Sequence, residues 1–136
     1  MLQSIAAVTV LVPNYYDGLR FFRDVLGFVV LEDSPLGAEK RWVVVAPSRG
    51  AGSALVLAVP SNDRQRVRLG DQTGGRVGFF VHTDDFRSDY ETMRSRGVRF
   101  LETPRSEPYG LVAVFLDPWG GKWDLLQPAD RSGGIP

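Results

Sequence analysis

The apolar and polar positions near the start of the chain predict a strand followed by a helix. Apolar residues occupy every second position from Val8 to Val12, and this two-residue period predicts a half-buried strand. Leu19, Phe22 and then residue 25 or 26 recur at helical spacing, and Gly27 is placed to end that helix. Three strand-like stretches follow, at residues 28 to 31, 41 to 45 and 54 to 59.

The same pattern returns after a polar stretch. Val77, Phe79 and Val81 repeat the valine spacing of the first strand. A second helix is expected next, with Asp84 or Asp85 as its N-cap. Its apolar stripe is Phe86, Tyr90 and Met93, Gly97 ends it, and three more strands are expected at 98 to 101, 111 to 116 and 122 to 127.

The repeat predicts an α+β fold built from two tandem βαβββ modules in one domain. The expected boundaries are module one at residues 5–59, a linker at 60–75, module two at 76–128 and a tail at 129–136. One such module leaves an apolar sheet face uncovered, so two copies are needed to bury it. We expect a curved mixed sheet with the helices outside and a concave pocket inside.

Composition narrows the possible partners. The chain has 136 residues, 43% of them hydrophobic, which suits one domain with a proper core. Its 16 basic and 16 acidic side chains cancel, which argues against nucleic acid or an anionic membrane as a partner. No apolar run is long enough to span a bilayer, and the first residues lack the pattern of a signal peptide, so a cytoplasmic location is expected.

Several runs resemble one known family. The segment VPNYYDGLRFFRDVLGF in the first half, and VGFFVHTDDF, RSRGVRFLETP and PYGLVAVFLDPWGGKWDLLQP in the second, are similar to the vicinal oxygen chelate superfamily. This superfamily includes glyoxalases, bleomycin-resistance proteins and extradiol dioxygenases. The resemblance covers residues 5 to 128 and implies the paired-module fold expected above.

The resemblance also implies where a metal would bind. Metal-dependent members take ligands from the first and last strands of each half, and those positions fall here on Ala7, Val56, Arg76 and Asp124. Only Asp124 can ligate, because alanine and valine offer no electron pairs and a guanidinium stays protonated. The resemblance therefore implies a member without the usual metal ligands. No metal or other cofactor is expected, and an extradiol dioxygenase is disfavoured.

Arg76 and Asp124 are the polar candidates for a site. If both point into the pocket, they form a structural salt bridge or hold a polar ligand group between them. Asp124 is also the candidate catalytic residue, as a general base. The remaining ligand-binding candidates are Thr9, Leu11, Phe80, Trp42 and Tyr109, and for the aromatic residues Trp42 and Tyr109 ordinary core packing is the alternative.

Two functions follow from these candidates. The first is metal-independent binding of a small, largely apolar molecule in the pocket of a homodimer, as the resemblance to bleomycin-resistance proteins implies. The alternative is a glyoxalase-like lyase or isomerase that uses Asp124 while Arg76 orients an anionic substrate. The single histidine, His82, is interpreted as a turn residue near the rim of the pocket, since no second titratable group supports a catalytic role.

Overall fold

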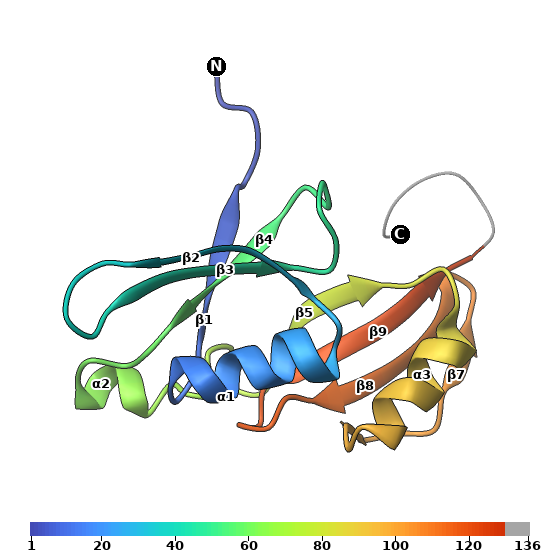
Figure 1. Cartoon of the computed structure of the whole chain (residues 1–136). Coiled ribbons are helices and arrows are strands. Elements are labelled where there is room, and N and C mark those ends of the chain that lie inside the picture. The colour runs from blue at the N-terminus through green and yellow to red at the C-terminus, as the bar shows by residue number, and fades with distance from the viewer. Residues whose placement is uncertain (130–136) are drawn as a thin grey trace. The chain divides into compact units, whose positions relative to one another are not determined.

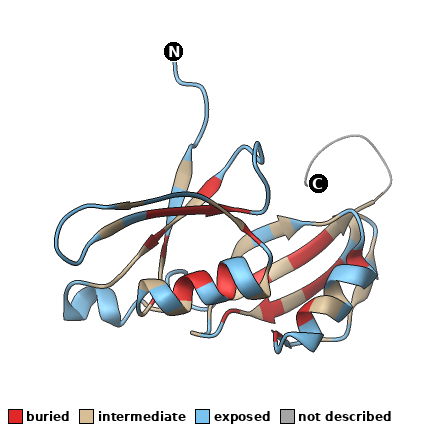
Figure 2. Cartoon of the chain, viewed as in Figure 1, coloured by how far each residue is buried: buried red, intermediate tan, exposed pale blue. Residues whose placement is uncertain are grey.

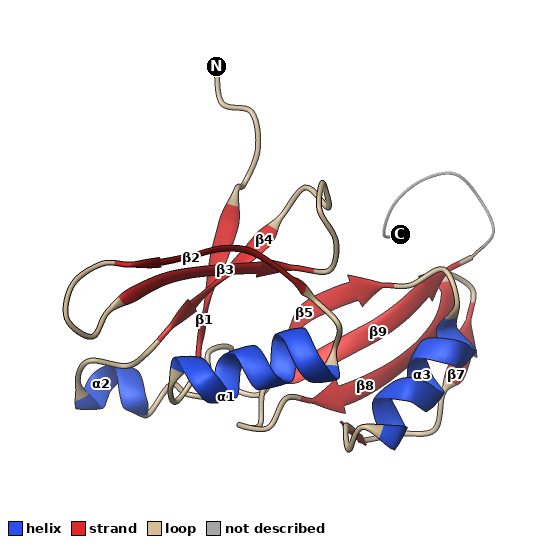
Figure 3. Cartoon of the chain, viewed as in Figure 1, coloured by secondary structure: helices blue, strands red, loops and turns tan. Residues whose placement is uncertain are grey.

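The computed structural model of the chain describes residues 1–129. The chain divides between Leu69 and Gly70 into two compact units, and the described part of each is treated by itself. The tail expected from residue 129 onward lies outside the described residues except for Ala129. Figure 3 shows that both units combine a sheet with helical segments.

The first unit is a strand, a helix and three further strands, followed by a short helix (Figure 1). Its sheet has the order β1-β4-β3-β2. β1 runs parallel to β4, whereas β3 is antiparallel to both β4 and β2. The strands are β1 (Ala7–Leu11), β2 (Val29–Pro35), β3 (Arg41–Ala46) and β4 (Ala54–Ala58).

The first helix changes its winding partway along. It begins as α1 (Tyr15–Leu19), where the Asn14 side chain accepts a hydrogen bond from the Asp17 amide, and continues as the π-helical η1 (Arg20–Val25). The wider π turn is visible in the bond from the Leu26 amide to the Phe21 carbonyl at 2.9 Å. Both Phe21 and Phe22 are buried, one more aromatic than a single α-helical stripe had predicted.

The helix packs closely on one face of its sheet. A Cβ added to Gly18 would lie 3.0 Å from Val12 and 3.2 Å from Leu57, so glycine permits the close approach. Val10 and Val43 are the strand partners of Leu57 on the same side of the sheet, and all three are buried. Figure 2 shows buried segments both in the helix and in the strands of this unit. Val10 and Val12 are therefore buried on the side of the sheet that faces this helix, whereas Val8 is 47% exposed.

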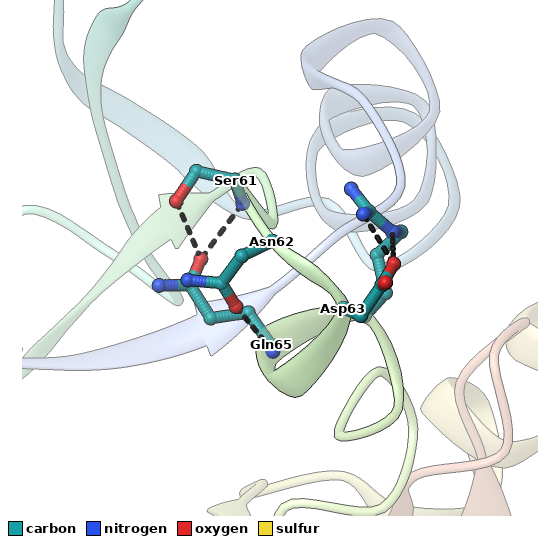
Figure 4. A network of polar contacts seen from close by, with 5 residues as sticks. Ser61, Asn62, Asp63 and Gln65 are labelled. Atoms are coloured by element: carbon teal, nitrogen blue, oxygen red, sulfur yellow. Dashed lines mark hydrogen bonds and ion pairs between the residues drawn. The ribbon is translucent and has the colours of Figure 1, made fainter.

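The polar stretch expected as a linker contains a helical turn. α2 (Asp63–Arg66) begins at Asn62, whose side chain accepts a hydrogen bond from the Gln65 amide at 2.9 Å. The Gln65 side chain in turn accepts from the amide and the hydroxyl of Ser61 (Figure 4). The boundary between the two units follows closely, between Leu69 and Gly70.

The second unit repeats the strand order of the first. Its sheet has the order β5-β9-β8-β6, with β7 paired to β8, and its helix α3 (Phe86–Ser95) follows β5. β5 is parallel to β9, and β8 is antiparallel to β9. The strands are β5 (Val77–His82), β6 (Arg99–Phe100), β7 (Arg105–Glu107), β8 (Gly110–Leu116) and β9 (Lys122–Pro128). The sequence had not predicted β7.

Aromatic side chains form the core between this sheet and α3. The Trp123 ring lies 4.5 Å from Phe79 and 5.8 Å from Phe115, measured between centroids, and Phe100 lies 4.5 Å from Tyr90 of the helix. Such pairs add to the burial of their large apolar area. These residues fix which face of the sheet is covered by α3.

Two polar groups hold the beginning of α3. The Asp85 side chain accepts from the Ser88 amide at 3.2 Å, which confirms one of the two caps that the sequence had predicted. Gln127 of β9 accepts from the Phe86 amide at 2.8 Å. Because an amide at a helix start has no partner within the helix, the Gln127 contact ties α3 to the sheet.

The turn between β8 and β9 is built around a buried aspartate. Asp117 is 5% exposed, and its carboxylate accepts from the amides of Trp119 and Gly121 and from the Trp123 indole, at 2.8 to 3.1 Å. Burial raises the pKa of Asp117, and these hydrogen bonds oppose the rise. A Cβ on Gly121 would collide with the same carboxylate, so the turn needs glycine there.

The α+β class and the two βαβββ repeats predicted from the periodicity are thus confirmed. In the described part of the chain, no helix is both long and apolar enough to cross a membrane.

Candidate functional site

The face of the second sheet that points away from α3 carries the candidate acid. Phe79 and Trp123 are strand partners in the aromatic core, so the next pair, Phe80 and Asp124, points to the opposite side. Val114 of β8 is the partner of Asp124 on its other flank and shares that side. We call this the open face of the second unit, defined by Phe80, Val112, Val114, Asp124 and Leu126.

Asp124 has an oxygen with no partner. Its Oδ1 is buried, and within residues 1–129 no hydrogen-bond donor reaches it. Burial is the main cause of a raised pKa for this carboxyl group, Arg105 counteracts the rise, and Glu102 adds to it. An unpaired buried acceptor costs free energy in the folded state, and such groups gather at functional sites.

A charged cluster from β7 and the segments beside it lies near Asp124. Arg105 donates to Glu102 at 3.1 Å through Nε and to Glu107 at 2.6 Å through Nη1, and its Nη1 also lies 3.4 Å from the Tyr109 hydroxyl. Glu102 also accepts from the Val114 amide at 3.1 Å. We call Glu102, Arg105, Glu107 and Tyr109 the β7 cluster.

The strand register places the β7 cluster on the open face. Arg105 is the partner of Val112 across the β7 and β8 pair, and partners in a sheet point to the same side. Contacts with Tyr109 and Glu107 raise the pKa of the Arg105 guanidinium above its usual value. The positive charge that acts on Asp124 therefore comes from Arg105.

Sequence reasoning identified Tyr109 but missed the three charged residues of this cluster. A signal was available, because Glu102, Arg105 and Glu107 stand close together just before the β8 strand, at a spacing that lets one arginine pair with two acids. In the sequence, this segment contributes only to the family resemblance. Without β7, there was no reason to place Arg105 on the same side as Asp124.

Arg76 lies apart from these groups. Arg76 immediately precedes β5 and is exposed. Its backbone carbonyl accepts a hydrogen bond from the Thr73 hydroxyl at 2.6 Å. The register shifts at Gly78, so that Val77 pairs with Lys122 while Phe79 pairs with Trp123. This bulge breaks the two-residue period, and Val77 rather than Arg76 takes the side of Lys122 and Asp124. The two-residue period that linked Arg76 to Asp124 is therefore interrupted at Gly78, and a ligand-binding role for Arg76 stays a prediction.

The other candidates of the second unit lie on or beside the open face. Phe80 is 54% exposed, which is high for a phenylalanine in a strand. Tyr109 is half-buried and belongs to the β7 cluster. His82 is the last residue of β5 rather than a turn residue, it is exposed, and its strand partner is Leu126.

The remaining candidates belong to the first unit. Thr9 pairs with Val56, and Val56 pairs with Val44, so these three share the sheet face opposite α1. Leu11 is in phase with Thr9, and Trp42, 40% exposed, is in phase with Val44. A small apolar cluster lies on this face, made of Val44, Ala46 and Ala54 with Ala7 and Val56 packed against it.

The donor set does not suit a metal ion. Among residues 1–129, no group of three or more His, Cys, Asp or Glu side chains is placed to hold one. Ala7 and Val56, two of the four positions implied by the resemblance, lie in the apolar cluster just described. Asp124 is the one acid at these positions, and a single carboxylate leaves a divalent ion mostly hydrated.

Comparison with known proteins identifies relatives along nearly the whole chain. Residues 4–125 match the sequence model of the Glyoxalase/Bleomycin resistance protein/Dioxygenase superfamily. An uncharacterized protein of Shewanella frigidimarina is 42% identical over 132 residues, which cover 96% of this chain and 98% of the relative.

Two solved structures are also similar to the chain. The crystal structure of UcmS2 has a TM-score of 0.78 at 30% identity, covering 93% of this chain and 98% of its own. TnmS3, an antibiotic binding protein from Streptomyces sp. CB03234, has a TM-score of 0.76 at 30% identity, covering 94% of this chain and 98% of its own.

Proposed function

The chain belongs to the Glyoxalase/Bleomycin resistance protein/Dioxygenase superfamily, and from this premise we propose that it binds a small, largely apolar molecule without a metal ion. The observation that carries the proposal is the composition of the open face, where apolar side chains lie beside Asp124 and the β7 cluster. Val112 and Leu126 are buried there, Val114 is half-buried, and Phe80 is exposed. An apolar surface with few polar groups is typical of small-molecule sites.

The relatives support the same class of function. TnmS3 is an antibiotic binding protein, and its fold and length match this chain. We propose, as part of this function, that the protein works as a homodimer in the cytoplasm and that a second copy completes the pocket. Sedimentation analysis of the purified protein tests the dimer, since a monomer at all concentrations contradicts it.

Binding is tested with 2-naphthol as a flat apolar probe, followed by calorimetric titration with and without EDTA. We expect saturable binding that EDTA leaves unchanged. Phe80→Ser removes exposed apolar area from the open face and is expected to weaken binding. Leu111→Ser is the matched control, because Leu111 is also exposed but alternates with Val112 and so points to the other side of β8.

Two results refute this proposal. One is binding that requires an added divalent metal, together with a metal found at one equivalent in the purified protein. The other is that 2-naphthol does not bind to the unmodified protein. Equal losses from Phe80→Ser and Leu111→Ser would show that the open face is not the site.

The state of Asp124 favours a second candidate function, proton transfer next to a carbonyl group. A carboxyl group with a raised pKa and an unpaired oxygen is suited to accept a proton from carbon and return it to the neighbouring atom. The test is deuterium incorporation into hydroxyacetone in D2O, followed by NMR. Catalysis that Asp124→Asn abolishes supports this function, and exchange at the uncatalysed rate excludes it for this compound.

A further inference from the structure

The charged groups on the open face differ in whether a neighbouring residue of opposite charge already pairs with them. Arg105 is shared between Glu102 and Glu107, so its positive charge is already more than balanced by two acids. Asp124 forms no ion pair among the described residues, and it adds a third acid beside this group. Lys122 points to the same side of β9 but is not among the groups that shift the pKa of Asp124.

Arg105 is consequently poorly placed to receive an anion. Its Nε and Nη1 donors are engaged at 3.1 Å and 2.6 Å, and a carboxylate ligand that reached the remaining Nη2 would approach Glu102 and Glu107 as well. Like charges at such distances repel, and partial burial strengthens the repulsion. Arg105 therefore acts as a positioning residue that holds the β7 cluster beside Asp124.

Asp124, in contrast, has acceptor capacity to spare. Oδ1 is covered and unpaired, while the residue as a whole is only half-buried. The terminal torsion of an aspartate is broad and roughly two-fold, so either oxygen can turn toward an incoming group. A donor on a ligand would supply a hydrogen bond that the protein itself does not make, and bonds to charged groups are among the stronger ones.

We propose that Asp124 is the polar anchor of the binding site and that it selects neutral or cationic molecules bearing an O–H or N–H donor over anions. This inference rests on the proposed function, and it adds the chemical class of the ligand. In this inference the β7 cluster excludes anions. This is the opposite of the alternative function, in which an arginine orients an anionic substrate.

Four probes of one shape test the selection. They are 2-naphthol, 2-naphthylmethylammonium, 2-methoxynaphthalene, which lacks a donor, and the anion 2-naphthoate, each titrated calorimetrically into the intact chain. We expect the first two to bind about tenfold more tightly than 2-methoxynaphthalene, the gain of one hydrogen bond to a partly buried charge. 2-Naphthoate is expected to bind most weakly.

Two variants assign the effect to residues. Asp124→Leu keeps the approximate size but removes the acceptor, so the advantage of 2-naphthol over 2-methoxynaphthalene is expected to disappear. Glu107→Gln removes one of the acids that hold Arg105 and is expected to strengthen 2-naphthoate binding severalfold. Glu91→Gln, at an exposed position of α3, is the matched control and should change neither ratio.

The outcomes separate this inference from the function on which it rests. If 2-methoxynaphthalene or 2-naphthoate binds as tightly as 2-naphthol, or if the donor advantage survives in Asp124→Leu, the inference is overturned while apolar binding stands. If none of the four probes binds to the unmodified protein, both proposals are overturned.

Discussion

Replacing Asp124 with asparagine should stabilise the protein at neutral pH. The wild-type side chain holds an unpaired, buried Oδ1, and burial raises its pKa. Asparagine has nearly the same shape but carries no charge, so the folded state no longer has to desolvate a carboxylate. Residues at functional sites are often kept at a cost in stability, and their replacement commonly stabilises the fold.

The size of the effect follows from the charge on one buried oxygen. A buried polar group without a partner costs about 1–3 kcal/mol and more when it is charged, and asparagine removes only the part that is due to the charge. Because Asp124 is only half-buried and water screens the rest of the group, we take the lower end, about 1 kcal/mol. For a chain of 136 residues this corresponds to a rise in Tm of about 3–5 °C.

The stability gained by Asp124→Asn should increase with pH. A folded-state pKa above the unfolded value means that the unfolded chain releases its proton first as pH rises, so this group makes the wild type less stable. The stability difference between Asp124→Asn and the wild type is therefore near zero below the unfolded pKa of about 3.9. It increases as pH rises through the folded pKa and is constant above it.

The assay is urea denaturation of both proteins at several pH values. Asp117→Asn is the matched control, because Asp117 also has a pKa raised by burial but makes hydrogen bonds through both oxygens. In Asp117→Asn, an amide nitrogen facing the Trp123 indole would place two hydrogen-bond donors together. We therefore expect this variant to lose about 1–3 kcal/mol in the free energy of unfolding. Destabilisation by Asp124→Asn, or a gain that does not vary with pH, would refute this account of Asp124.

Two further substitutions test the packing of the first unit. Gly18→Ala should destabilise the protein by about 1–3 kcal/mol despite the higher helix propensity of alanine, because the new Cβ would lie 3.0 Å from Val12. In a double-mutant cycle measured by denaturation, a Val12→Ala background should reduce this loss. Tyr15→Phe should cost about 1 kcal/mol, because the hydroxyl contacts both the amide and the carbonyl of Arg41 at 3.2 Å, whereas Tyr16→Phe, at an exposed position, should leave Tm unchanged.

Much of the architecture was predictable because it depends on short-range patterns. The valine spacing around Val10, the cap at Asp85 and the repetition of the pattern in the second half are all confirmed. The additional burial of Phe21 was not predictable, because it depends on a π turn that apolar spacing does not reveal. β7 is too short to show a period of its own.

The candidate site was only partly predictable. Asp124 was identified from its place in the last strand, and the structure puts it on the open face with an unpaired oxygen. Arg76 was predicted to share a face with Asp124 because side chains alternate along a strand, but the bulge at Gly78 interrupts this alternation. The positive group that acts on Asp124 is Arg105, from a strand that the sequence had not indicated.

The sequence by itself therefore determined the order of strands and helices apart from α2 and β7, because periodicity is a local property. Its family resemblance singled out Asp124 as the one acid at the family's ligand positions. Tertiary structure decided which charges share a face. A side chain's direction near a bulge depends on the register with a partner strand distant in the sequence, and that register is set only when the strands pair.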